Sequence, residues 1–224
     1  MKIYRYGKVE STQNIAKQLL KKGAERGSII VADSQIKGKG RLNRTWISSA
    51  GGLYCSIIIK RDNFLPITVA VAVVETLYQI GIEATIKWPN DILVLDKKIA
   101  GILIETSGNN AIVGIGINIT KVPLKTATSL AQEGIEVSRD NLLRYLYESF
   151  MNTLRYPKQT IQDIYRKFSH TLGKNVKIKL NEEEVIGIAK DIDSDGGLLI
   201  QRDSRLIKIV AGDCLYIDST QKKE

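Results

Sequence analysis

Apolar and polar positions follow different periods in successive segments of this chain. Residues 28–33, 53–60 and 111–119 are short, nearly continuous apolar runs, which are typical of buried β-strands. Residues 139–156 and 159–169 repeat apolar side chains every three or four positions, which predicts two amphipathic helices. The chain is therefore expected to combine sheet and helix in one domain.

Further elements of the first half of the chain follow from the same pattern. Polar residues open a helix at residue 11, and Gly23 ends it. The Val- and Ala-rich stretch at 66–80 is interpreted as a helix because its length and the glycine that follows favour helix over strand. The remaining predicted elements are an edge strand at 2–6 and a hairpin of strands at 92–95 and 99–106.

The pattern changes after residue 171, where short alternating segments are separated by turn residues. These segments lie at 176–180, 185–190, 198–202, 206–210 and 214–217. Closely spaced short strands predict a small β-barrel. We therefore expect an α+β fold with two domains: residues 1–171, a mixed sheet with flanking helices, and residues 172–224, the small barrel.

Size and charge narrow the class of protein. The chain has 224 residues, of which 43% are hydrophobic and 25% charged, as in ordinary soluble domains. Neither a membrane-length apolar run nor an N-terminal apolar signal segment is visible, so we expect a cytoplasmic protein. The net charge of +9 favours anionic ligands, acidic partners or nucleic acid.

Cysteine and histidine usage excludes several kinds of site. Cys55 and Cys214 are far apart and form no CxxC pair, so they are interpreted as two thiols in a reducing compartment. His170 is the only histidine. A histidine-based metal site and a Ser–His–Asp triad are therefore nearly excluded.

The most unusual stretch is residues 35–46, which read QIKGKGRLNRTW. Its four cations cannot all be buried and paired, and its two glycines allow the backbone to approach a ligand closely. The cations are Lys37, Lys39, Arg41 and Arg44, and the glycines are Gly38 and Gly40. Phosphate is the ligand that this chemistry favours, and Trp46 offers a face for stacking a base. The alternative is a solvated basic loop.

Three other clusters lie at predicted turns or strand ends. They are the turn at 87–91, Lys98 with Gly101 and Glu105, and the segment 114–118. Each has an ordinary structural explanation: Lys98 as a turn lysine, Asp91 as a turn cap, and Asn118 as a strand-end hydrogen bonder. Gly114 and Gly116 share one strand face, which suggests either a close ligand or a bulge.

Taken together, these motifs resemble the biotin protein ligases. The family pattern GRGRxxRxW stands here as GKGRLNRTW at 38–46, and KWPND is intact at 87–91. The pattern K-[LI]-A-G-I-L-[VI]-E stands at 98–105, and G-x-G-[IL]-N stands at 114–118. The family's S-T-N helix start stands as Ser11-Thr12-Gln13. The motifs cover about residues 4–120, and the strand pattern adds the C-terminal barrel, which is SH3-like in the family.

The resemblance implies a two-step reaction. Biotin is activated by ATP to biotinyl-5′-AMP, with release of pyrophosphate, and a lysine of a biotin carboxyl carrier protein then takes the biotin. The implied catalytic residues are Lys98, Arg41 and Asp91. The implied biotin-binding residues are Ser11, Thr12, Gln13, Gln35, Lys39, Gly40, Arg41, Lys98, Gly101 and Gly116. The implied ATP and adenylate-binding residues are Lys39, Arg41, Asn43, Arg44, Trp46 and Asn118.

The resemblance also implies Mg²⁺, held mainly through ATP phosphates, with Asp91 as a candidate ligand and no dedicated acidic cage. Three residues depart from the family pattern. Gln13 replaces Asn, and Lys39 replaces Arg, which removes a bidentate contact and predicts weaker retention of the intermediate. Asn43 replaces glycine, and Asn tolerates left-handed backbone angles.

Two other functions compete with this interpretation. A lipoate ligase or octanoyltransferase would share the fold, but the KWPND motif and the loop with Trp46 argue against it. A basic nucleic-acid-binding module would explain the charge but not Lys98, Gly114 or Gly116. Since the first family motif begins at Ser11, we expect an enzyme without a regulatory DNA-binding domain. Family members often pair as homodimers, which is the oligomeric state expected here.

Overall fold

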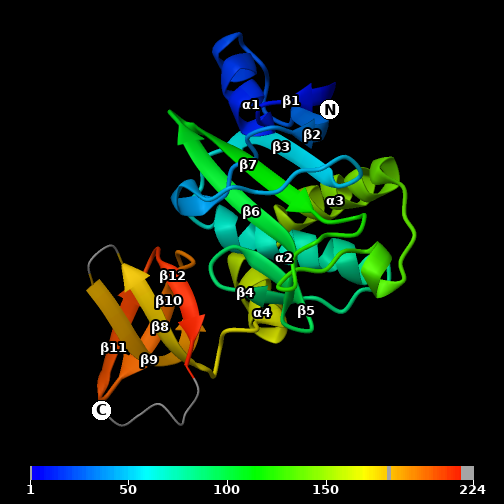
Figure 1. Ribbon diagram of the computed structural model, residues 1–224. Helices are drawn as coiled ribbons and strands as arrows, with labels where there is room; N and C mark the ends of the chain where they lie inside the picture. The colour runs from blue at the N-terminus through cyan, green and yellow to red at the C-terminus, as the bar shows by residue number, and fades with distance from the viewer. Residues whose placement is uncertain (1, 181–182, 218–224) are drawn as a thin grey trace.

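A computed structural model describes residues 2–180 and 183–217 (Figure 1). It contains a seven-stranded sheet in the order β1-β2-β3-β7-β6-β5-β4 and a five-stranded sheet in the order β11-β10-β9-β8-β12. The strands of the first sheet are β1 Ile3–Val9, β2 Ile29–Gln35, β3 Leu53–Lys60, β4 Thr85–Lys87, β5 Asp91–Val94, β6 Lys97–Ser107 and β7 Asn110–Ile117. Only β1 and β2 pair in parallel, so the sheet is mixed.

Four α-helices accompany these sheets in the described part of the chain. They are α1 Thr12–Lys21, α2 Leu65–Gln79, α3 Arg139–Thr153 and α4 Lys158–Phe168. Helix α2 is buried along most of its length, although its Val residues have modest helix propensity. Burial against the sheet and against α3 therefore decides its conformation.

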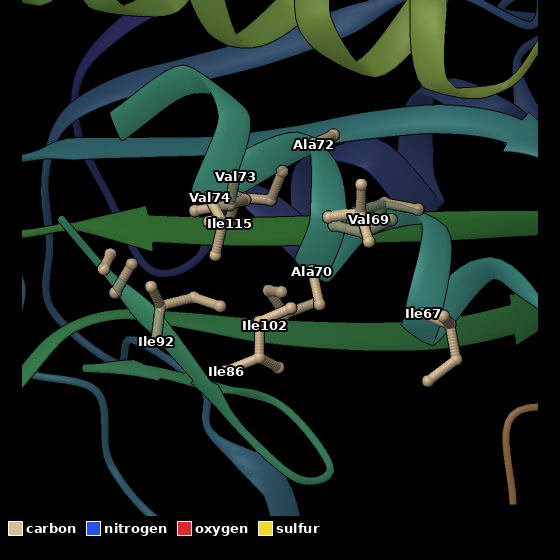
Figure 2. Packing of buried hydrophobic residues seen from close by; sticks show 14 of the residues in the cluster. Ile67, Val69, Ala70, Ala72, Val73, Val74, Ile86, Ile92, Ile102 and Ile115 are labelled. Atoms are coloured by element: carbon tan, nitrogen blue, oxygen red, sulfur yellow. The ribbon is translucent and has the colours of Figure 1, made fainter. Parts of the chain in front are cut away.

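One face of the seven-stranded sheet forms the main core with α2 (Figure 2). Its sheet residues include Ile86, Ile92, Ile102 and Ile115, and its helix residues include Val69, Ala70 and Val73. All are almost completely buried. Burial of such a side chain contributes roughly 1.5–3 kcal/mol, so this layer supplies much of the stability.

The opposite face is covered only in part by α1. A small second core joins Ala16 of the helix to Ile30, Ile58 and Ile112 of β2, β3 and β7. The segment 36–46 crosses the same face beyond the helix. This arrangement leaves room for a cavity between the loop and the sheet.

The C-terminal sheet is antiparallel and contains β8 Asn175–Leu180, β9 Glu183–Ile192, β10 Leu198–Arg202, β11 Arg205–Ile209 and β12 Asp213–Tyr216. Its buried side chains belong to the same hydrophobic cluster as the main core. The segment that connects α4 to β8 forms two hydrogen bonds with β4 and the residue after it. His170 N donates to Ile86 O (2.8 Å), and Trp88 N donates to Thr171 Oγ1 (3.0 Å).

The predicted α+β fold class, a mixed sheet with flanking helices, is confirmed, and the segment predicted as a small C-terminal barrel forms a five-stranded antiparallel sheet. Strands β3 and β10 have the predicted bounds, and most other ends differ by one to three residues. The expected domains also include residues 1, 181–182 and 218–224, which lie outside the described part. No helix within the described ranges is long and apolar enough to cross a membrane.

Candidate active site

A row of paired residues crosses the sheet on the face opposite to the main core. Lys87 pairs with Asp91, Asp91 with Gly101, Gly101 with Gly116, and Gly116 with Tyr54. Residues directly opposite each other in a sheet project to the same face. The row therefore presents two bare glycine positions in the middle, followed by a carboxylate and then an ammonium group.

A β-bulge brings Lys98 to this face. The pairing of β5 with β6 shifts between Ile92, which pairs with Ala100, and Leu93, which pairs with Lys98. Ile99 is the extra residue, and it reverses the side on which Lys98 projects. Without the bulge, strict alternation would direct Lys98 away from Gly101. The bulge places the Lys98 ammonium 2.5 Å from Asp91 Oδ1.

This face forms the floor of a cavity of about 230 Å³. Most of the predicted site residues line it: Ser11, Thr12, Gln13, Gln35, Lys39, Gly40, Arg41, Arg44, Trp46, Asp91, Lys98, Gly101 and Gly116. They come from the start of α1, the basic loop, and strands β5, β6 and β7. Side chains that are far apart in sequence thus converge on one hollow that contains both Lys98 and Arg41.

The indole of Trp46 lies directly over the two glycines. A β-carbon added at Gly116 would lie 2.5 Å from Trp46 Nε1, and one at Gly101 would lie 2.8 Å from Trp46 Cζ3. The Lys98 ammonium lies 5.2 Å from the centre of the indole ring. Stacking of Trp46 on an adenine stays a prediction; in this structure its ring closes the glycine strip.

Two arginines at the opening of the cavity contact carboxylate, amide and carbonyl oxygens. Arg44 forms an ion pair with Asp213 of β12. The Arg41 guanidinium donates to Asn90 Oδ1 (3.1 Å) and to Gly212 O (3.4 Å). Burial lowers the pKa of Arg41, although the Asp213 and Asp91 carboxylates oppose this effect. An anion that entered the cavity would therefore meet guanidinium groups that are already positioned.

The other end of the cavity is neutral and polar. Thr12 Oγ1 accepts a hydrogen bond from Ser56 Oγ (2.8 Å) and donates one to Gln35 Oε1 (3.2 Å). Gln35 Nε2 in turn donates to Ser48 Oγ (2.8 Å). This chain of hydrogen bonds fixes the start of α1 against the basic loop.

Two polar atoms at this end are buried without a partner among the described residues: Ser11 Oγ and Gln13 Oε1. The Gln13 amide nitrogen is held by the carbonyl oxygens of Leu103 (3.0 Å) and Ile112 (3.4 Å), so its oxygen remains available. A β-carbon at Gly114 would lie 2.9 Å from Gln13 Nε2, so a side chain at that strand position would displace the Gln13 amide. Unsatisfied buried polar atoms favour a ligand with its own hydrogen-bonding groups.

Two predicted residues do not line the cavity. Asn118 is buried, and its amide donates to Thr128 O (2.9 Å) and Lys98 O (3.4 Å), so it supports the backbone of Lys98 rather than facing a ligand. Asn43 is exposed, and its φ of 57° is the left-handed conformation that Asn tolerates. Lys39 lines the rim and donates to Asn14 Oδ1 (2.7 Å).

Sequence reasoning missed the contribution of the C-terminal sheet. Asp213, Cys214 and Leu215 line the cavity, although no motif marks them. The only local signal is Gly212, whose φ of 146° suits glycine. Burial raises the pKa of the Cys214 thiol to about 11 and that of Cys55 to about 12. Both thiols are therefore protonated at neutral pH and unsuited to nucleophilic attack.

The arrangement favours the joining of two anions. Cationic groups at one end would offset the repulsion between a carboxylate and a polyphosphate, and the neutral polar end would hold an uncharged ring system. No cluster of three or more metal-ligating side chains occurs within the described ranges. Asp91 and Asp213 are the carboxylates that line the cavity, and they are ion-paired with Lys98 and Arg44.

Comparison with known proteins agrees with this chemistry. Residues 6–121 match the model of the Biotin/lipoate A/B protein ligase family, and residues 171–215 match that of the Biotin protein ligase C terminal domain. The chain is 33% identical to the bifunctional ligase/repressor BirA of Bacillus subtilis, over 92% of this chain and 71% of that protein. It is 30% identical to the biotin–[acetyl-CoA-carboxylase] ligase of Mycobacterium tuberculosis, over 85% and 79% of the two chains.

Solved structures give the same relationship. The biotin protein ligase from Aquifex aeolicus, in complex with biotin and ATP, superposes with a TM-score of 0.83 at 30% sequence identity. The superposition covers 97% of this chain and 99% of the other.

Proposed function

This chain belongs to the Biotin/lipoate A/B protein ligase family, and from that premise we propose how its cavity carries out the reaction. The protein is an ATP-dependent biotin–protein ligase. It activates biotin to biotinyl-5′-AMP and transfers the biotin to a lysine of a carrier protein. The observation that carries this conclusion is the convergence of Lys98, Arg41 and the bare glycine strip on one cavity.

In the first step, a biotin carboxylate oxygen attacks the α-phosphorus of ATP, and the bond to the β-phosphate breaks. We assign to Lys98 the bridging position between the carboxylate and the α-phosphate, where its charge offsets their repulsion. Arg41 and Arg44 bind phosphate oxygens. To do so, Arg44 breaks its ion pair with Asp213. Stabilisation of developing charge by prearranged groups of this kind is commonly the largest catalytic contribution.

The polar end of the cavity is assigned to the biotin ring system. Its urea group has both N–H donors and a carbonyl acceptor, which complement Ser11 Oγ and Gln13 Oε1. Thr12 and Gln35 hold this end in shape, while Lys39 and Gly40 complete its rim. The apolar tail is assigned to the strip over Gly101 and Gly116, where it takes the place of the Trp46 indole, so its carboxylate reaches Lys98.

In the second step, the carrier lysine amine attacks the acyl carbon of biotinyl-5′-AMP, and AMP leaves. Asp91 is assigned as the group that receives the proton of that amine, because it is the carboxylate beside Lys98. Mg²⁺ is expected to accompany ATP, bound chiefly by phosphate oxygens, with Asp91 and Asp213 as the nearby carboxylates.

Several finer features remain predictions. The acceptor is a biotin carboxyl carrier domain, and the division between the two domains lies near residue 171. A homodimer would use an edge of the seven-stranded sheet, where β1 and β4 are the terminal strands. Size-exclusion chromatography with light scattering would measure the oligomeric state.

Transfer to a carrier domain tests the function. Incubation with ATP and biotin should modify a single carrier lysine, detected by mass spectrometry, and lipoate should give no product. Equal modification by lipoate would favour a lipoate ligase. Tight duplex DNA binding at physiological salt, without carrier modification, would favour the nucleic-acid-binding alternative.

A further inference from the structure

Lys87 is a positively charged residue of the cavity that has no role in the mechanism described above. It is the last residue of β4, and its side chain lines the cavity. The other principal cations have polar partners there: Lys98 pairs with Asp91, and Arg44 pairs with Asp213. Within the described ranges, Lys87 forms no ion pair. Its ammonium instead lies 4.8 Å from the centre of the Tyr216 ring.

The row of strand pairs defines where Lys87 lies relative to the reaction. Gly116, Gly101, Asp91 and Lys87 follow one another across four adjacent strands, on the same face. With the biotin tail over the glycines, its carboxylate reaches the α-phosphorus near Lys98 and Asp91. Phosphoryl transfer requires the attacking and leaving oxygens to be roughly in line. The leaving group therefore departs along the row, away from the glycines and toward Lys87.

We propose that Lys87 binds the pyrophosphate leaving group of the adenylation step, an inference that rests on the proposed ligase function. When the α-phosphorus–oxygen bond breaks, its electron pair stays on the bridging oxygen of pyrophosphate. The Lys87 ammonium neutralises the charge that develops there. Because it has no carboxylate to release first, Lys87 meets this charge without breaking an ion pair.

Tyr216 acts as a positioning residue for Lys87. Its ring provides the face against which the ammonium rests, and its hydroxyl is 3.1 Å from Thr171 Oγ1, which fixes the ring. A cation over an aromatic face is stabilised but remains free to bind an anion. The C-terminal sheet thereby contributes to the adenylation step through Tyr216, in addition to Asp213 of the same strand.

Lys174 offers a matched control on the same aromatic ring. Its ammonium lies 4.7 Å from the centre of the Tyr216 ring, almost the same distance as that of Lys87. However, Lys174 is exposed and does not line the cavity. A change at Lys174 removes a similar stacked cation without removing a group from the path of pyrophosphate.

The experiment separates the two half-reactions in the full-length protein. Lys87→Met should slow ATP-dependent formation of biotinyl-5′-AMP by roughly 10- to 100-fold, the size expected for loss of one charge-stabilising contact. The constant for product inhibition by pyrophosphate should weaken by a similar factor. Transfer of biotin from supplied biotinyl-5′-AMP to a carrier domain should change less than twofold, because that substrate has no β- or γ-phosphate.

Three further measurements make the result decisive. Lys174→Met should leave both half-reactions unchanged, and Lys87→Arg should restore pyrophosphate inhibition, which also covers the case in which Lys87→Met does not fold. Tyr216→Leu should weaken pyrophosphate inhibition without affecting transfer. The proposal is overturned if Lys87→Met slows both half-reactions equally, or if pyrophosphate inhibits the Met and Arg variants alike. Absence of biotin-dependent adenylation in the wild-type protein would instead reject the proposed function.

Discussion

The two faces of the seven-stranded sheet use the same strands for opposite purposes. On one face, Ile86, Ile92, Ile102 and Ile115 pack against α2 and are almost completely buried (Figure 2). On the other, their immediate neighbours in sequence are Lys87, Asp91, Gly101 and Gly116, which line the cavity. Since strand side chains alternate between faces, one rigid core positions the whole reactive row.

Adjacent residues of one strand thus have different roles: one stabilises the fold, and the next contributes to the reaction. A change on the isoleucine face should alter the free energy of unfolding and leave the reaction intact. A change on the glycine face should alter the reaction and have little effect on the free energy of unfolding. Variants of adjacent residues therefore test this division directly.

The largest effect is expected from Lys98→Ala. Loss of the ammonium that joins the two reacting anions should slow biotinyl-5′-AMP formation by about a thousandfold, as for removal of a major charge-stabilising group. The melting temperature should remain within a few degrees of the wild type. Stopped-flow or quench assays of the adenylate measure the rate. Lys97→Ala, in the exposed adjoining position, is the control and should retain full activity.

The next largest effect is expected on the isoleucine face. Ile92→Ala should lower the free energy of unfolding by about 2–5 kcal/mol, because it leaves a cavity in the main core and Ile92 does not line the active-site cavity. Urea denaturation followed by circular dichroism measures this value. At temperatures where the variant is folded, its affinity for biotin should match the wild type. A large loss of affinity in the fully folded variant would argue that the two faces are not separate.

A smaller effect is expected from Gly116→Ala on the glycine face. The new β-carbon would lie 2.5 Å from the Trp46 indole, so the indole must move and the strip narrows. We expect the biotin complex to bear an overpacking cost of about 1–3 kcal/mol beyond that of the free protein, which weakens biotin binding roughly 5- to 150-fold in calorimetric titrations. Gly7→Ala is a suitable control, because no atom lies within 4 Å of its added β-carbon. Unchanged affinity in Gly116→Ala would place biotin elsewhere.

The smallest effect is expected where the sheet meets the C-terminal sheet. Burial, and then the positive charge of Lys174, lowers the pKa of His170 below its usual 6.5, while Asp96 opposes this and Lys87 adds to it. The neutral imidazole is thus favoured in the folded state, so its stabilising contribution is present above about pH 6.5 and is lost as pH falls through the lowered value. His170→Gln should remove this part of the pH dependence. Thermal melts between pH 5 and 8 measure it, and identical profiles for both proteins would contradict the assignment.

Much of this division was predictable from sequence. Alternation along residues 111–119 identified Gly114 and Gly116 as sharing a face, and the ordered motifs identified the biotin ligase family. The main strands followed from short apolar runs, and α3 and α4 followed from the repeat of apolar side chains every three or four positions. Asn43 stands where the family has glycine, and its left-handed backbone agrees with the predicted tolerance of Asn for such angles.

The remainder depended on tertiary pairing, which periodicity does not encode. The bulge at Ile99 that directs Lys98 into the cavity leaves no recognisable sequence signature. Asp213 enters the site only because the C-terminal sheet folds against the basic loop. Binding of adenine by Asn118 stays a prediction, and its second contact, from its amide to the Lys98 backbone, could not be read from the sequence because it depends on tertiary packing.

A crystal structure of the protein with biotinyl-5′-AMP is the most direct test of the central claim. The account predicts that the biotin tail lies over Gly101 and Gly116, that the ring system contacts Ser11 and Gln13, and that the Lys98 ammonium lies within hydrogen-bonding distance of the phosphate. An adenylate bound away from the glycine strip, with Lys98 still paired only with Asp91, would contradict it.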